Sequence, residues 1–166
     1  MTRIRGIAVV TALLLGAGVA HADPCKVTIE SNDQMQYSAH ELAIAPQCKE
    51  VEVTLRNVGK LPAKVMAHDW VLARESDMPA IVNAGLAAGL THGFVPEHDP
   101  RVIAATHLVG GGESATVRFS TAALAPGDHY SFFCTSPGHS TVMRGRFLFG
   151  EPGRVAQAGK SRTNPQ

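Results

Sequence analysis

The chain has 166 residues, of which 45% are hydrophobic and 17% charged, and its formal net charge is +1. A chain of this length and composition is expected to form one globular domain with a substantial apolar core. The near-neutral charge argues against a nucleic-acid partner, because binding nucleic acid requires clustered positive charge.

The N-terminal segment has the pattern of a secretory signal peptide. Arg3 and Arg5 supply a short basic region, residues 7–19 form an apolar run, and the tripeptide Ala-His-Ala at 20–22 has the form of a cleavage site. The run is shorter than the ~20 residues that a membrane-spanning helix needs. We therefore expect residues 1–22 to be removed on export, leaving a mature protein without a membrane anchor. In a Gram-negative bacterium this protein would reside in the periplasm.

Segments with strand character follow along the chain. Apolar and polar residues alternate with a period of two in three of them, at 27–30, 51–56 and 114–119. Three more are continuously apolar or nearly so, at 65–73, 129–135 and 145–149. The alternation predicts strands with one buried face. Because turn sequences separate the segments, the pattern predicts an all-β Greek-key sandwich or barrel.

One segment breaks the strand pattern. Residues 79–88 are rich in alanine and begin with Pro79, after the capping candidates Ser76 and Asp77, so they predict a short helix inserted between strands. The domain is expected to span residues 23–149. Residues 150–166 are polar and contain Pro and Gly, and we expect them to form a disordered tail.

The three cysteines divide into a pair and one remaining thiol. Export would place the chain in an oxidising compartment, where disulfides persist. Cys25 and Cys48 lie early in the chain beside strand-like segments, and a disulfide between them would stabilise the fold by about 3 kcal/mol. Cys134 would then remain reduced, either as a buried inert residue or as a functional thiol.

The sequence "YSFFCTSPGHSTVMRG" places three soft metal ligands in one loop. Cys134 offers a thiolate, His139 an imidazole and Met143 a thioether, a set that favours copper, whereas magnesium and calcium prefer oxygen ligands. His68, in the apolar segment "VMAHDW", is the best candidate for a fourth ligand, because an unpartnered histidine is costly to bury. Two histidines, one cysteine and a weak axial methionine form a type 1, or blue, copper site.

Two other functions use some of the same residues. In a cysteine-dependent hydrolase, Cys134 would be the nucleophile and a histidine the base, but Met143 would then have no role. In a non-redox metal protein, such as a zinc-binding or copper storage or chaperone protein, the two histidines and Cys134 would bind the metal without cycling its charge.

The chain resembles the azurins of the cupredoxin family. The matching segments are "NDQMQY", "LPAKVMAHDWVL", "RVIAATHLVGGGE" and "YSFFCTSPGHSTVMRG", which occur in the azurin order and at similar spacing. The likeness covers residues 25–148. It implies a cupredoxin-like fold and a one-electron carrier without enzymatic activity. It also implies a disulfide between Cys25 and Cys48 that matches the family disulfide.

The resemblance also implies the copper ligands. His68, Cys134 and His139 would lie in the plane of the site, with Met143 as axial ligand and the backbone carbonyl of Ala67 as a weaker axial contact. Redox proteins such as c-type cytochromes and periplasmic reductases or dehydrogenases would be transient partners of a monomer. They would dock on an apolar patch around the exposed ligand histidine, formed by Met35, Leu61, Met66, Leu86, Pro137, Gly138 and Val142.

Besides Ala67, where azurins usually have glycine, three positions depart from the azurin pattern close to the expected site. Ser136 replaces a bulky apolar residue, Asp69 replaces an asparagine, and Asn57 stands where many azurins have a titrating histidine. Neighbours of metal ligands tune the potential through charge and hydrogen bonds. We expect an ionised Asp69 to favour the cupric state. Ser136 is expected to act oppositely by a hydrogen bond near the sulfur of Cys134, or else to admit water.

Overall fold

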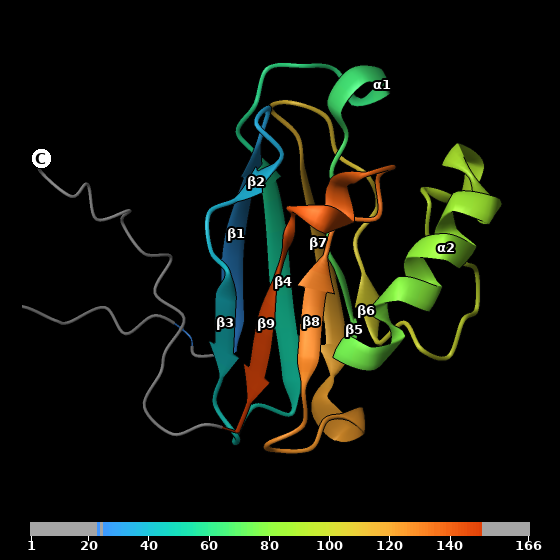
Figure 1. Ribbon diagram of the computed structural model, residues 1–166. Coiled ribbons are helices and arrows are strands. Elements are labelled where there is room, and N and C mark those ends of the chain that lie inside the picture. Colours follow the sequence, from blue (N-terminus) through green and yellow to red (C-terminus); the bar gives the residue numbers. More distant parts are fainter. Residues whose placement is uncertain (1–22, 24, 151–166) are drawn as a thin grey trace, which may run out of the picture.

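The computed structural model describes residue 23 and residues 25–150, and within them two β-sheets pack face to face (Figure 1). The first sheet has the order β2-β1-β4-β7, formed by β1 (Lys26–Asn32), β2 (Gln36–Tyr37), β4 (Glu50–Asn57) and β7 (Ser114–Ser120). The second has the order β3-β9-β8-β5-β6, formed by β3 (Glu41–Ile44), β9 (Arg144–Phe149), β8 (Tyr130–Phe133), β5 (Val71–Arg74) and β6 (Ala104–Ala105). The predicted all-β sandwich is therefore confirmed.

Both sheets are mixed. β1 runs parallel to β4, and β3 runs parallel to β9, while β4–β7 and β8–β9 are antiparallel. In β4 the alternation read from the sequence matches the burial, because Val51, Val53 and Leu55 are fully buried and the residues between them are not. Side chains from the inner faces of both sheets meet in one core.

Aromatic rings fill the centre of the core. The Trp70 ring lies 6.1 to 6.2 Å, between ring centroids, from Phe119, Phe132 and Phe147. Tyr37 continues the cluster, at 5.5 Å from Phe132. Such pairs add to the free energy gained from burying the rings, so this cluster is a main source of stability for the sandwich.

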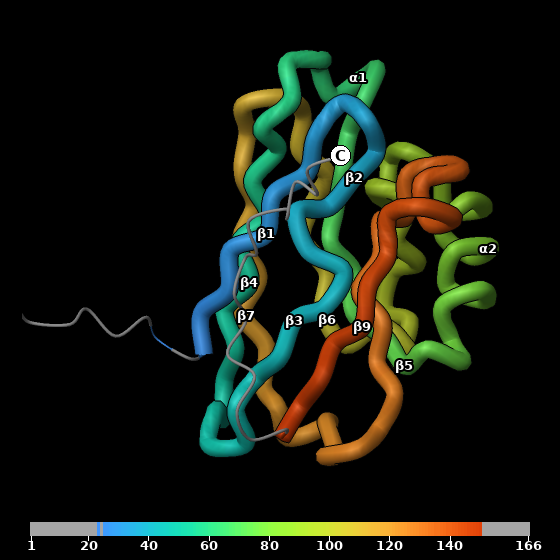
Figure 2. Tube along the Cα trace, turned by 60° about the vertical axis from the view of Figure 1, so that its left-hand side comes forward, coloured from blue at the N-terminus to red at the C-terminus, as the bar shows by residue number. Residues whose placement is uncertain are grey.

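Helix α2 (Met78–Ala88) covers the outer face of the second sheet (Figures 1 and 2). Its Met78 and Ile81 pack with Val71 and Phe133 in a second, smaller apolar cluster. The predicted helix over 79–88 is thus present. Ser76 and Asp77 do not cap it through their side chains, because both lie in a 3-10 turn at Glu75–Asp77 that leads directly into the helix.

The predicted strand over 65–73 is wrong in its first part. A short helix, α1 (Ala63–Met66), occupies that position, and β5 begins only at Val71. The Pro62 carbonyl accepts hydrogen bonds from the amides of Val65 and Met66, at 2.8 and 3.1 Å, which closes a helical turn. A continuous apolar run carries no periodicity that separates a strand from such a turn.

A disulfide joins Cys25 and Cys48, with an S–S distance of 2.04 Å and a sequence separation of 23, and Cys134 is free and buried. At the other end of the domain, the Gly150 amide donates to the Ile44 carbonyl of β3, at 3.0 Å. The predicted signal peptide, 1–22, and residues 151–166 of the predicted tail lie outside the described residues. In the part of the chain that the structure describes, no helix is long and apolar enough to cross a membrane.

Candidate metal centre

Three side chains from two segments that are far apart in sequence meet at one end of the sandwich. His68 lies between α1 and β5, Cys134 directly follows β8, and His139 begins a 3-10 turn at His139–Thr141. Their ligand atoms all lie within 4.8 Å of one another. The Cys134 sulfur is 4.0 Å from Nδ1 of His68 and 3.6 Å from Nδ1 of His139. This is the one such group of three among the described residues.

Hydrogen bonds fix the orientation of His68. Its backbone exchanges two hydrogen bonds with Val109, at 3.0 and 2.8 Å. Its Nε2 lies 2.9 Å from the carbonyl oxygen of Asn32. Because a carbonyl only accepts, Nε2 carries the proton in the neutral ring, and the lone pair of Nδ1 is directed to the Cys134 side. The ring is therefore held in the tautomer that a metal ligand requires.

Burial determines the protonation states of the three groups. His68 and Cys134 have no exposed surface, and His139 is 9% exposed. Burial lowers the pKa of His139, and burial together with the neighbouring His139 lowers the pKa of His68. Burial and then the Asp69 carboxylate raise the pKa of the Cys134 thiol. Two imidazoles whose neutral form is favoured, beside a thiol that a bound cation would deprotonate, are a donor set that fits copper.

The loop that carries Cys134, His139 and Met143 closes on itself. The Met143 amide donates to the His139 carbonyl at 2.7 Å, and the Cys134 amide donates to the Met143 carbonyl at 3.0 Å. The His139 amide donates to the Ser136 carbonyl at 2.9 Å. Met143 itself is fully buried. These bonds set the spacing of the three side chains, and the ligand role of Met143 stays a prediction.

A buried carboxylate ties the Cys134 loop to the His68 segment. Asp69 is fully buried, and its carboxylate accepts hydrogen bonds from the Thr135 amide, at 2.7 Å, and from the Thr135 hydroxyl. On the other side, the Tyr37 hydroxyl donates to the Asp69 carbonyl. Burial raises the pKa of the Asp69 carboxyl to about 6, against the effect of the hydrogen bonds from Thr135. The sequence did not indicate that Tyr37 would contact the ligand segment; it only lies in one of the segments that resemble azurins.

The other two departures from the azurin pattern are also buried. The Ser136 hydroxyl donates to the Ala67 carbonyl at 2.7 Å, so the bond expected near the Cys134 sulfur is made to a different acceptor. Asn57 donates to the Val109 carbonyl at 3.2 Å and accepts from the Gly59 amide at 3.0 Å. Because Val109 is the backbone partner of His68, Asn57 supports that ligand segment.

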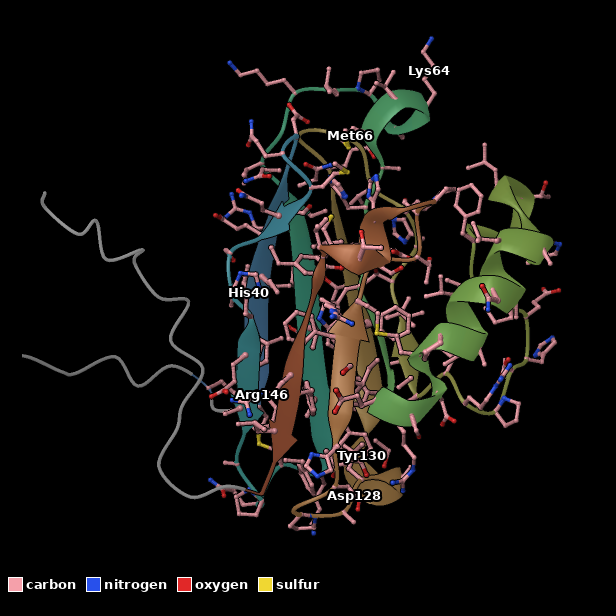
Figure 3. The ribbon with its side chains drawn as sticks, viewed as in Figure 1. His40, Lys64, Met66, Asp128, Tyr130 and Arg146 are labelled. Carbon is pink, nitrogen blue, oxygen red and sulfur yellow. A yellow bond between two sulfur atoms is a disulfide. The ribbon has the colours of Figure 1, made fainter. Side chains whose placement is uncertain are left out.

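The residues of the expected docking patch differ in exposure. Met35, Leu61, Leu86 and Val142 are 37–53% exposed, Pro137 and Gly138 are exposed, and Met66 is partly buried. Figure 3 places Met66 at the end of the sandwich where α1 lies, with Lys64 extending into solvent, whereas Asp128 and Tyr130 lie at the opposite end. Val65 is 59% exposed and was not expected on this surface, because the strand predicted there would have buried it.

Comparison with known proteins agrees with this site. The family of copper-binding proteins described as plastocyanin/azurin matches residues 23–149. An azurin of Bordetella pertussis is 45% identical over 124 residues, which cover 75% of this chain and 83% of that protein. An azurin of Pseudomonas aeruginosa is 42% identical over 142 residues, which cover 86% of this chain and 96% of that protein. The chain therefore belongs to the plastocyanin/azurin family of copper-binding proteins, and the group of His68, Cys134 and His139 is the site that suits one copper ion.

Proposed function

We propose that the mature protein is a periplasmic one-electron carrier that shuttles electrons between redox proteins through a type 1 copper site. The observation that carries this proposal is a buried thiol beside two imidazoles, one of which, His68, is oriented by a hydrogen bond to the Asn32 carbonyl. Copper bound there supplies one-electron redox chemistry by cycling between the cupric and cuprous states. His68, Cys134 and His139 would hold it, together with Met143 and the Ala67 carbonyl.

The protein's own contribution is to keep these ligands in one arrangement. The bonds of the His139–Met143 turn, the two backbone bonds between His68 and Val109, and the bonds between Asp69 and Thr135 are all made by the protein itself. A site held by its own hydrogen bonds changes little when the charge of the ion changes, and small rearrangement favours fast electron transfer. His139 alone of the three ligands retains partial exposure, so we assign electron entry and exit to its edge.

The partners are proposed from the surface around His139 and from the predicted signal peptide. An apolar patch with few charges suits brief docking, because little area needs to be buried and the complex separates quickly. We propose c-type cytochromes and periplasmic reductases or dehydrogenases as these partners, and a monomeric carrier. Export by residues 1–22 would place the protein with them.

The test is to add cupric ion to the purified mature chain. The expected result is an intense blue thiolate-to-copper band that disappears on reduction and returns on oxidation. A colourless protein that binds zinc or copper tightly would contradict the carrier and would instead support the non-redox alternative, since two histidines and a cysteine also bind zinc.

A charge placed on the patch is expected to slow electron exchange. Val142 is 53% exposed beside the His139 turn, and Val142→Asp would bring two like charges together when two copies dock through this surface. The rate of electron self-exchange between oxidised and reduced protein, measured by NMR line broadening, should fall at least about tenfold. Ala125→Asp, near Asp128 and Tyr130, is the matched control and should leave the rate unchanged. Equal slowing in both variants would remove the patch from the proposal.

Removing the charge of Asp69 is expected to raise the reduction potential. An ionised carboxylate directly after His68 stabilises the cupric ion more than the cuprous ion, because the cupric ion carries the larger charge. Voltammetry of Asp69→Asn in neutral buffer tests this. Asp128→Asn removes the same charge at the opposite end of the sandwich and should have little effect. An unchanged or lower potential in Asp69→Asn would refute the expectation.

A further inference from the structure

A serine hydroxyl reaches across to the backbone beside the first ligand histidine. Ser136, in the turn between Cys134 and His139, is 6% exposed, and its Oγ lies 2.7 Å from the Ala67 carbonyl oxygen. Ala67 is the residue directly before His68 and follows the last turn of α1 in extended conformation. Among the described residues, no backbone amide donates to this carbonyl outside the regular elements. The hydroxyl is thus the donor that the structure provides for it.

The bond joins the two segments that carry the ligands. The backbone carbonyl of Ser136 accepts from the His139 amide, while its side chain donates to Ala67. Serine is flexible enough to point to solvent, yet here it is nearly buried and its hydroxyl is directed at a carbonyl. A bulky apolar residue at this position would have no hydrogen to donate. The contact therefore depends on the hydroxyl of Ser136, which an apolar residue lacks.

We propose that Ser136 is a positioning residue that weakens the hold of the Ala67 carbonyl on the oxidised ion and so raises the reduction potential. This inference rests on the proposed function. A hydrogen bond draws electron density from the carbonyl oxygen and fixes its direction. A carbonyl dipole stabilises a doubly charged ion more than a singly charged one, so weakening it destabilises the cupric state more. Weak axial groups, a backbone oxygen included, tune the potential of such sites.

Ser136 and Asp69 then act in opposite directions on the same ligand segment. The carboxylate of Asp69 adds negative charge on one side of His68, and the hydroxyl of Ser136 withdraws it from Ala67 on the other. Removal of the first raises the potential, and removal of the second lowers it.

The test compares four variants of the mature protein. Ser136→Ala and Ser136→Val remove the donor, and Ser136→Thr keeps it; Thr and Val have nearly the same shape, so this pair isolates the hydroxyl. Thr141→Ala is the matched control, because Thr141 is exposed in the same loop and donates to the Gly138 carbonyl, at 2.8 Å, away from Ala67. Voltammetry should give a lower reduction potential for Ser136→Ala and Ser136→Val than for the wild type. Ser136→Thr and Thr141→Ala should have the wild-type potential.

A second measurement needs no metal. In the copper-free protein, the NMR carbonyl shift of Ala67 should move upfield in Ser136→Ala and Ser136→Val, as expected for the loss of a hydrogen bond, and should be retained in Ser136→Thr. Should Ser136→Ala not fold, the pair of Ser136→Thr and Ser136→Val still decides the question.

The two proposals fail in different ways. A wild-type protein without a reversible blue band ends the carrier proposal. A wild-type protein with such a band, in which the Ala and Val variants have an unchanged or higher potential, leaves the carrier intact and overturns the role of Ser136. Equal potentials in Ser136→Thr and Ser136→Val would do the same, since the effect would then come from packing.

Discussion

Cys134→Ser should abolish the blue band completely while the domain remains folded. The band arises from charge transfer between a thiolate and cupric ion, and the other two cysteines are held in a disulfide. A serine hydroxyl cannot replace the thiolate, because it stays protonated near neutral pH and is a much harder ligand. The absorbance of the copper-loaded protein, scanned through the visible range, measures the loss.

Ser140→Ala provides the control for this variant. Ser140 is buried in the same loop, 9% exposed, and offers no ligand that copper favours. Its variant should keep the band and the circular dichroism of the wild type. A Cys134→Ser protein that is still intensely blue would show that the site described above does not hold the copper.

Phe132→Ala should destabilise the domain by about 3 to 5 kcal/mol, the usual effect of removing a fully buried phenylalanine ring. The ring has no exposed surface and packs between Tyr37 and Trp70, at centroid distances of 5.5 and 6.1 Å. Its loss leaves a cavity at the centre of the sandwich that neither sheet can close. Urea unfolding of the metal-free protein, with both cysteines of the disulfide oxidised, gives the free energy of unfolding.

A substitution at an exposed position serves as the control for the loss of the buried ring. Val58 is 49% exposed, so Val58→Ala should change the free energy of unfolding by no more than about 0.5 kcal/mol. If Phe132→Ala were equally mild, the aromatic cluster would not be the main source of core stability. The metal-free protein is the right sample, because bound copper would stabilise the native state by mass action and mask the difference.

Local patterns were sufficient for much of the fold. The alternation in β4 and β7 and the apolar β8 segment identified strands because each strand places successive side chains on opposite faces. The two-residue strands β2 and β6 escaped detection, since a period of two cannot be recognised in two residues. At α1, a run of apolar residues was compatible with either a strand or a helical turn. The hydrogen bonds to the Pro62 carbonyl show that this segment is a helical turn.

The metal centre, too, could be predicted in part from local sequence. Cys134, His139 and Met143 lie in one short loop, so their residue types and spacing could be read from the chain, and His68 could be selected because an apolar segment offers an imidazole no other partner. The resemblance to azurins added the expectation for Ala67. Residue types, their spacing and their likeness to a motif are properties of the local sequence, so they can be recognised without knowledge of the fold.

Contacts between distant segments were decided by the tertiary structure alone. The Ser136 bond to Ala67, the Tyr37 bond to Asp69 and the Asn57 bond to Val109 join residues that are 69, 32 and 52 positions apart. A polar side chain does not reveal its partner until packing excludes water and leaves one donor or acceptor within reach. The sequence by itself determined the class of fold and the candidate ligands; the packing of the two sheets determined which groups lie in hydrogen-bond contact with the segments that carry them.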